Sequence, residues 1–131
     1  MECLFCKIVE GEIDSHVVYE DEKCLVILDI NPHSKGHVLV IPKEHTKIFV
    51  MSNPEIMSHM LKITYLYSKL IEKEFNKSTT ISIQNGGAAG QNIQHASIQI
   101  IPGNVFNLKK NKENSEEIFE KIKKIVHSSF D

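Results

Sequence analysis

The 131-residue sequence has no long apolar run, no excess of basic residues and no internal repeat. A membrane-spanning helix needs about 20 consecutive apolar residues, so no membrane span is expected. The formal net charge is −2 at pH 7, whereas a general nucleic-acid-binding protein would carry a basic face. With 41% hydrophobic and 24% charged residues, the composition predicts an ordinary globular protein that binds neither membranes nor nucleic acids.

Cysteine is also scarce, with three in the chain, and the N-terminus lacks the basic and then apolar pattern of a secretory signal. We therefore expect a cytoplasmic protein whose thiols stay reduced, without a disulfide framework. The length fits one domain, residues 1–131, that can bury a core without cross-links.

Apolar periodicity predicts the secondary structure. Five segments have the pattern of strands: 16–20, 24–30, 36–42, 79–84 and 93–101. A long helix is expected to begin at Pro54, capped by Ser52 or Asn53, and to end near Phe75. Its expected apolar side is Ile56, Met60, Ile63, Tyr67, and Leu70 or Ile71.

A C-terminal helix, capped near Asn114 and Ser115, completes the predicted secondary structure. It is expected to carry four residues on one side: Ile118, Ile122, Ile125 and Val126. The sum is an α+β domain, an antiparallel sheet of about five strands with one long central helix and a C-terminal helix.

The stretch CLFC, residues 3–6, places two thiols close together. Two thiolates at this spacing bind one metal ion readily, and zinc needs two more ligands. His45 follows the third predicted strand and His95 lies on the last, so both could join the thiols if these strands are neighbours. An isolated Cys-x-x-Cys also suits a redox pair or chance, and the residues alone leave these alternatives open.

Polar and apolar residues alternate along the last predicted strand, with His95, Ser97 and Gln99 on one side. The strand before it has a polar side of its own: Thr80, Ser82 and Gln84. The two sides could form one polar patch, which is compatible with a pocket or with a plain solvent face.

The glycine-rich loop NGGAAGQN, residues 85–92, joins these two strands. Its backbone N–H groups could turn toward an anion, although a simple hairpin connection is also possible. It contains no Lys or Arg, so it is not a Walker loop. Asp29, at the end of a strand, is either a turn former before Pro32 or a carboxylate that holds ribose hydroxyls.

Three long stretches together resemble the histidine triad (HIT) family of nucleotide hydrolases and transferases. They occur in the family's order and span nearly the whole chain: CLFCKIVEGEI, VYEDEKCLVILDINPHSKGHVLVIPKEH and NGGAAGQNIQH. The resemblance implies a homodimer of α+β subunits that holds a purine mononucleotide, such as AMP or GMP, at its surface. It also implies structural zinc, with four ligands: Cys3, Cys6, His45 and His95.

In that family, three histidines alternate along a strand, and the middle one attacks the α-phosphorus of the nucleotide. By resemblance, these three positions are His95, Ser97 and Gln99 here, so Ser97 and Gln99 take the catalytic positions. The resemblance also implies that Asp29 holds the ribose and that Ile30 lies near the base. The full set of implied nucleotide contacts outside the triad is Asp29, Ile30, His37, Asn85, Gly90, Gln91 and Asn92.

Ser97 departs from the family pattern in a way that affects chemistry. The family's transferase branch tolerates glutamine at the third position, but a serine without an adjacent base is a poor nucleophile. Loss of a nucleophile lowers kcat on the order of a million-fold in other covalent enzymes. The family's usual arginine after the strand's proline is also absent, since Gly103 follows Pro102.

We therefore expect a HIT-family nucleotide-binding protein with weak or no catalysis. One alternative is an active purine nucleoside phosphoramidate or dinucleotide hydrolase, in which the serine is engineered or is bypassed by direct attack of water. Another is a dimeric zinc-stabilised scaffold that acts through protein contacts.

Overall fold

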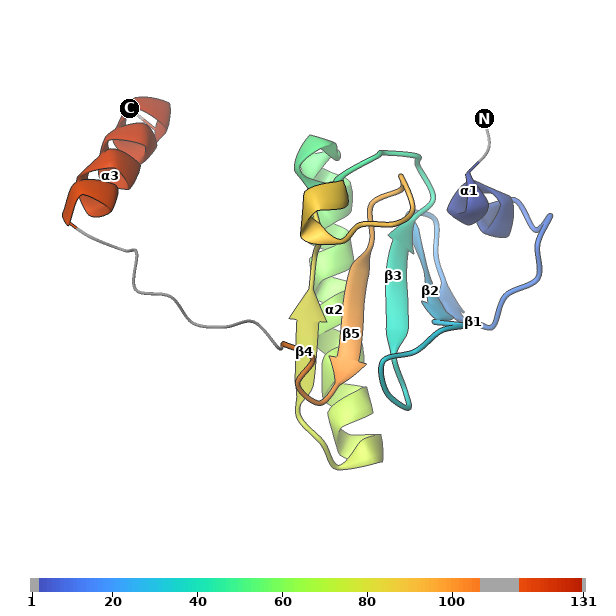
Figure 1. The fold of residues 1–131 in the computed structure, drawn as a ribbon. Coiled ribbons are helices and arrows are strands. Elements are labelled where there is room, and N and C mark those ends of the chain that lie inside the picture. Colours follow the sequence, from blue (N-terminus) through green and yellow to red (C-terminus); the bar gives the residue numbers. More distant parts are fainter. Residues whose placement is uncertain (1–2, 107–115, 131) are drawn as a thin grey trace.

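A computed structural model describes residues 3–106 and 116–130 and has a five-stranded antiparallel sheet at its centre (Figure 1). The strand order is β1-β2-β3-β5-β4. The strands are β1 (Val17–Glu20), β2 (Cys24–Leu28), β3 (Val38–Pro42), β4 (Thr79–Ser82) and β5 (Ile98–Pro102). The helices are α1 (Leu4–Val9), α2 (Pro54–Phe75) and α3 (Glu116–Phe130), with 3-10 turns η1 (Phe49–Met51) and η2 (Gly87–Ala89). This arrangement confirms the predicted α+β class.

Two apolar clusters cover the two faces of the sheet. Val38 and Val40 of β3 pack with α2, whereas Leu39 and Ile41 pack with α1 and its Phe5. Alternate residues of one strand thus enter different cores, which explains why β2 and β3 are almost continuously apolar. None of the helices within 3–106 and 116–130 is long and apolar enough to cross a bilayer.

Helix α2 begins where the sequence predicts. The Asn53 side chain caps it by accepting a hydrogen bond from the Glu55 N–H at 2.9 Å, and Pro54 takes the first position. The helix ends at Phe75, as predicted, and is capped by Asn76, which has a left-handed backbone. Of the two residues left open for its apolar side, Ile71 is buried and Leu70 is 60% exposed.

Three expectations about local structure need correction. Residues 93–97 are not part of a strand, because β5 begins at Ile98. The predicted strand 79–84 ends at Ser82, and the short helix α1 was not expected. For the C-terminal helix, the expected caps Asn114 and Ser115 and the side chain of Val126 lie outside the described residues.

Candidate functional site

Three separate segments bring the predicted metal ligands together. Helix α1 carries Cys6 in its first turn and is capped by Cys3, whose Sγ accepts the Cys6 N–H at 3.3 Å. His45 follows β3, and His95 precedes β5, which pairs antiparallel with β3. The pairing of these two strands, which the sequence left as a condition, is therefore present.

The four ligand atoms lie within 4.8 Å of one another. Nδ1 of His95 is 3.3 Å from Cys3 Sγ, 3.6 Å from Cys6 Sγ and 3.2 Å from His45 Nδ1. Cys6 Sγ is 3.2 Å from His45 Nδ1. Zinc–sulfur bonds of about 2.3 Å and zinc–nitrogen bonds of about 2.0 Å give tetrahedron edges of roughly 3.3–3.8 Å, so these residues fit a zinc ion.

The surroundings of the cluster support metal binding by its ligand atoms. The His95 ring is 1% exposed, and its Nε2 donates to the Pro42 carbonyl at 2.8 Å. That bond leaves the lone pair of Nδ1 directed into the cluster. Burial lowers the pKa of His95, although the bond to Pro42 acts in the opposite direction. Burial also raises the pKa of the Cys6 thiol to about 11, and proximity to Cys3 adds to this rise. A cation among these atoms would offset the penalty for ionising the thiols.

The three polar residues that were predicted to share one side of a strand, His95, Ser97 and Gln99, do not lie together. His95 points into the buried cluster, because residues 93–97 do not alternate as a strand does; the Ala96 N–H donates to the Thr46 carbonyl at 2.7 Å instead. Gln99 does lie on β5, opposite Ser82 of β4, and its amide N–H donates to Gln84 Oε1 at 2.9 Å. The polar sides of β4 and β5 therefore meet as predicted, but His95 is not part of that patch.

Ser97 lies between His95 and Gln99 in the chain and is half-buried. Within the described residues, no histidine or carboxylate hydrogen-bonds its hydroxyl. The described residues therefore provide no general base for Ser97, and an unassisted serine hydroxyl is a poor nucleophile.

His37 links the third triad position to Asp29. The backbone N–H of His33 donates to His37 Nδ1 at 3.1 Å, so the ring proton is on Nε2. Nε2 lies 3.0 Å from Gln99 Oε1, to which it donates, and 3.5 Å from Asp29 Oδ2. Burial lowers the pKa of His37, although the nearby Asp29 charge acts in the opposite direction. Ile30, which follows Asp29 in the chain, is 84% exposed.

Gln91 organises the glycine-rich loop. Its Oε1 accepts the Gly86 N–H at 2.7 Å, and its amide nitrogen donates to the carbonyls of Lys47 at 2.6 Å and Ile93 at 2.8 Å. Asn85 Oδ1 accepts the Val50 N–H at 3.2 Å, and Asn92 is exposed. The sequence did not indicate that both N–H groups of the Gln91 amide would be used within the protein.

Gly90 has a backbone that requires glycine. Its φ is +93°, and a Cβ there would lie 2.7 Å from Gln84 Nε2. The loop therefore approaches the polar patch of β4 and β5 closely at this point.

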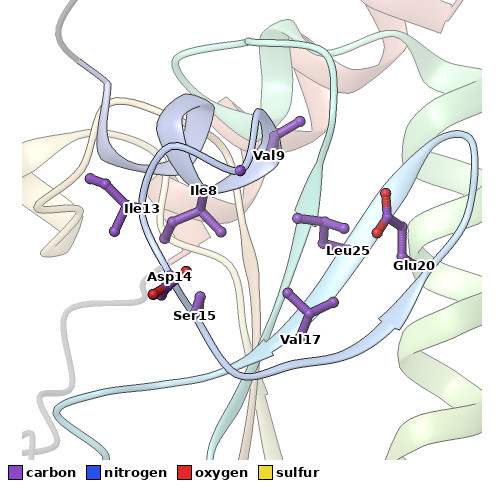
Figure 2. A pocket seen from close by; sticks show the side chains of 9 residues that line it. Ile8, Val9, Ile13, Asp14, Ser15, Val17, Glu20 and Leu25 are labelled. Atoms are coloured by element: carbon purple, nitrogen blue, oxygen red, sulfur yellow. The ribbon is translucent and has the colours of Figure 1, made fainter.

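A separate cavity of about 230 Å³ lies between α1 and the first two strands (Figure 2). It includes none of the residues predicted to bind nucleotide or metal. Its lining is Ile8, Val9, Gly11, Ile13, Asp14, Ser15, Val17, Glu20 and Leu25. It is smaller than the roughly 300–1,000 Å³ of typical ligand sites, so it is not the candidate nucleotide site.

Known proteins are similar along most of the chain. An uncharacterized HIT-like protein from Methanocaldococcus jannaschii is 41% identical over 100 residues, covering 76% of this chain and 78% of that protein. An adenylylsulfatase from Arabidopsis thaliana is 40% identical over 77% of this chain, which spans 52% of that longer protein. An adenosine 5′-monophosphoramidase from Schizosaccharomyces pombe is 38% identical, covering 78% of this chain and 74% of that protein.

Solved structures share the fold. A HIT family member from Bacillus subtilis superposes with a TM-score of 0.90 and 31% identity, covering 100% of this chain and 99% of that one. A HIT family protein from Bacillus anthracis has a TM-score of 0.89 and 33% identity, with 99% and 98% covered. A Zn-bound histidine triad family protein from Mycobacterium smegmatis has a TM-score of 0.76 and 30% identity, with 98% of both chains covered. The family model for the HIT domain matches residues 10–105. The chain belongs to the HIT family.

Proposed function

We propose that this HIT-family chain binds a purine mononucleotide, such as AMP or GMP, and hydrolyses nucleotide substrates weakly or not at all. The observation that carries the proposal is Ser97, a serine without a base at the position that the family resemblance gives to the nucleophile. The neighbouring groups Gln99, His37 and Asp29 remain hydrogen-bonded or close to one another. A site that keeps its binding groups but lacks its nucleophile binds without turnover.

The proposed binding mode assigns one part of the nucleotide to each part of the site. The Asp29 carboxylate accepts hydrogen bonds from the ribose hydroxyls, and Ile30 packs against the base. The phosphate lies near Ser97, Gln99 and the loop around Gly90, with Asn85 and Asn92 at its edges. Gln91 acts by holding this loop in shape, because its amide already bonds three backbone groups.

We also assign a structural zinc ion to Cys3, Cys6, His45 and His95. Support comes from the two-thiol, two-imidazole set at tetrahedral spacing and from the Zn-bound relative of Mycobacterium smegmatis. When bound, zinc would tie α1 to the ends of β3 and β5; it takes no part in nucleotide chemistry. Thiol ligands of this kind suit the reducing cytoplasm, where we place the protein.

A homodimer completes the proposal. Among the described residues β4 pairs only with β5, so its outer edge is open to another strand. Ile81 of β4 has an exposed apolar side chain, and so do Leu61 and Tyr65 of α2. Tyr65 is two turns before Glu72, whose carboxylate accepts the Thr79 hydroxyl at 2.7 Å, so this side of α2 runs along β4. An open edge flanked by apolar side chains is typical of an interface between copies.

Calorimetric titration with AMP tests nucleotide binding. We expect saturable binding in the micromolar range, about 8 kcal/mol. Asp29→Ala should abolish it, whereas Asp14→Ala, an acid in the separate cavity, should not. No heat from folded, zinc-loaded protein would favour the scaffold alternative. Rapid release of AMP from an adenosine 5′-phosphoramidate by the unaltered chain would favour the hydrolase alternative.

A further inference from the structure

Helix α3 (Glu116–Phe130) lies apart from the sheet and from α2, on the side of β4 (Figure 1). All of its described side chains, residues 116–125, are exposed. Phe119 is 56% exposed and Ile122 is 55% exposed. The side opposite Ile122 is charged, with Glu116, Glu120 and Lys124. Lys123 lies between the two sides, with its Nζ 5.7 Å from the centre of the Phe119 ring. One apolar and one charged side is the pattern of a helix that packs against another surface.

A helix of this length does not persist by itself. It has 15 residues, and isolated helices of about 12–15 residues are marginal in water even when their sequences favour helix. Most helical stability in proteins comes from packing of the apolar side. Since α3 does not pack on its own sheet, another surface must cover Phe119 and Ile122 if the helix is to be stable.

The chain-wide superpositions indicate that this placement is specific. Helix α3 has 15 of the 131 residues. If α3 lay elsewhere, the TM-score could reach about 0.89 only if every other residue superposed exactly, whereas the Bacillus subtilis structure scores 0.90 over 100% of the chain. The Bacillus anthracis structure, at 0.89 over 99%, leads to the same conclusion. The two scores therefore indicate that both relatives hold this helix in a similar place, which a covering surface would explain.

We propose that α3 is an exchanged arm, which packs its Phe119–Ile122 side on a second copy of this chain. The arm extends past β4, the strand whose open edge and apolar neighbours form the proposed dimer interface. A segment that reaches beyond that edge lies over the partner, and two-fold symmetry makes the exchange reciprocal and closed. The inference rests on the proposed homodimer and is independent of nucleotide binding.

Cross-linking of an isotopically mixed dimer tests the exchange. Equal amounts of ¹⁵N-labelled and unlabelled full-length chain are unfolded, refolded together and treated with a lysine cross-linker. The α3 lysines Lys121, Lys123 and Lys124 provide the reactive groups. We expect links from α3 to the sheet domain to join labelled with unlabelled chains in roughly half of cases, as random pairing of subunits requires. Links only within chains of one isotope would overturn the proposal.

Paired variants test the packing itself. In Phe119→Ser/Ile122→Ser, amide exchange in α3 should be about tenfold faster or more, because the covering contact is lost. The matched control Glu120→Ser/Lys124→Ser changes the charged side of the same helix and should keep the protection. Equal protection in both variants, or α3 amides unprotected in the unaltered chain, would refute the arm. If the protein has the mass of a dimer in solution while α3 contacts only its own chain, the exchange of α3 is refuted and the homodimer is retained. A protein with the mass of a monomer would refute both.

Discussion

Replacing Cys6 with alanine is expected to release the proposed zinc ion and, with it, the attachment of α1. Cys6 Sγ lies near both cluster histidines, at 3.2 Å from His45 and 3.6 Å from His95. Helix α1 has six residues, too few to form a stable helix without tertiary contacts. Besides the packing of Phe5 against Leu39 and Ile41 of β3, the metal would be the link that ties α1 to the ends of β3 and β5.

The loss of stability can be estimated from what α1 buries. Phe5 of α1 is buried in the core, and burial of such a side chain stabilises by about 1.5–3 kcal/mol. Detachment would also uncover Leu39 and Ile41 of β3, which pack in the same cluster. The sum is on the order of 3–5 kcal/mol, which corresponds to a fall in Tm of about 10–20 °C for a chain of this size.

The assay combines metal analysis with thermal unfolding, before and after treatment with a chelator. The unaltered protein should contain one zinc ion per chain, and Cys6→Ala should contain little. Met57→Ala is the control for general destabilisation, since this buried side chain packs in the other cluster and its loss should leave the zinc content unchanged. Zinc retained by Cys6→Ala, or zinc lost with Tm unchanged within about 2 °C, would refute the reasoning.

Three further changes have expected outcomes. Ser97→His should create measurable hydrolysis of adenosine 5′-phosphoramidate by restoring the nucleophile, with the exposed Gln94→His as a control that stays inactive; a folded but inactive Ser97→His would count against the nucleotide site. Gly90→Ala should weaken AMP binding and destabilise by about 1–2 kcal/mol, since the left-handed backbone strains an alanine and the added Cβ would displace the Gln84 amide; unchanged binding in calorimetry would contradict this. Burial alone would raise the pKa of Asp21, but hydrogen bonds from His59, backbone N–H groups and Tyr19 hold it well below its usual value. Stability from a lowered carboxyl pKa is present above the unfolded value of about 3.9 and is lost as pH falls toward the folded pKa. Asp21→Asn should therefore be less stable by about 1–3 kcal/mol at pH 7 in urea unfolding. The difference in unfolding free energy between the two proteins should narrow below about pH 4. A difference that stays constant with pH would exclude the hydrogen-bonded Asp21 carboxylate as its cause.

The regular elements could be predicted because their signals are local. Apolar alternation and continuous apolar runs located all five strands, and Asn53 with Pro54 marked the start of α2. The choice between Leu70 and Ile71 could not be made, because it depends on the angle at which α2 meets the sheet. The unpredicted helix α1 is held by Phe5 in the core and by the cysteine cluster, and six residues are too few to show a helical period.

The candidate site was predicted less completely because its geometry depends on contacts between distant segments. The spacing of His95, Ser97 and Gln99 suggested one polar row, but His95 is directed inward by its bond to the Pro42 carbonyl and by the cysteines. The use of the Gln91 amide by backbone groups depends on the position of residue 47, 44 residues away in sequence. Such hydrogen bonds across the fold leave no periodic signal in a single sequence.

A crystal structure of the unaltered chain soaked with an adenosine 5′-phosphoramidate would test the central claim most directly, because it reports binding and turnover together. We predict an intact ligand with its ribose hydroxyls on the Asp29 carboxylate and its phosphate beside Ser97 and Gln99. Complete conversion to AMP within a brief soak, or an adenylyl group on Ser97, would contradict the loss of catalysis. An empty site at saturating ligand would contradict nucleotide binding.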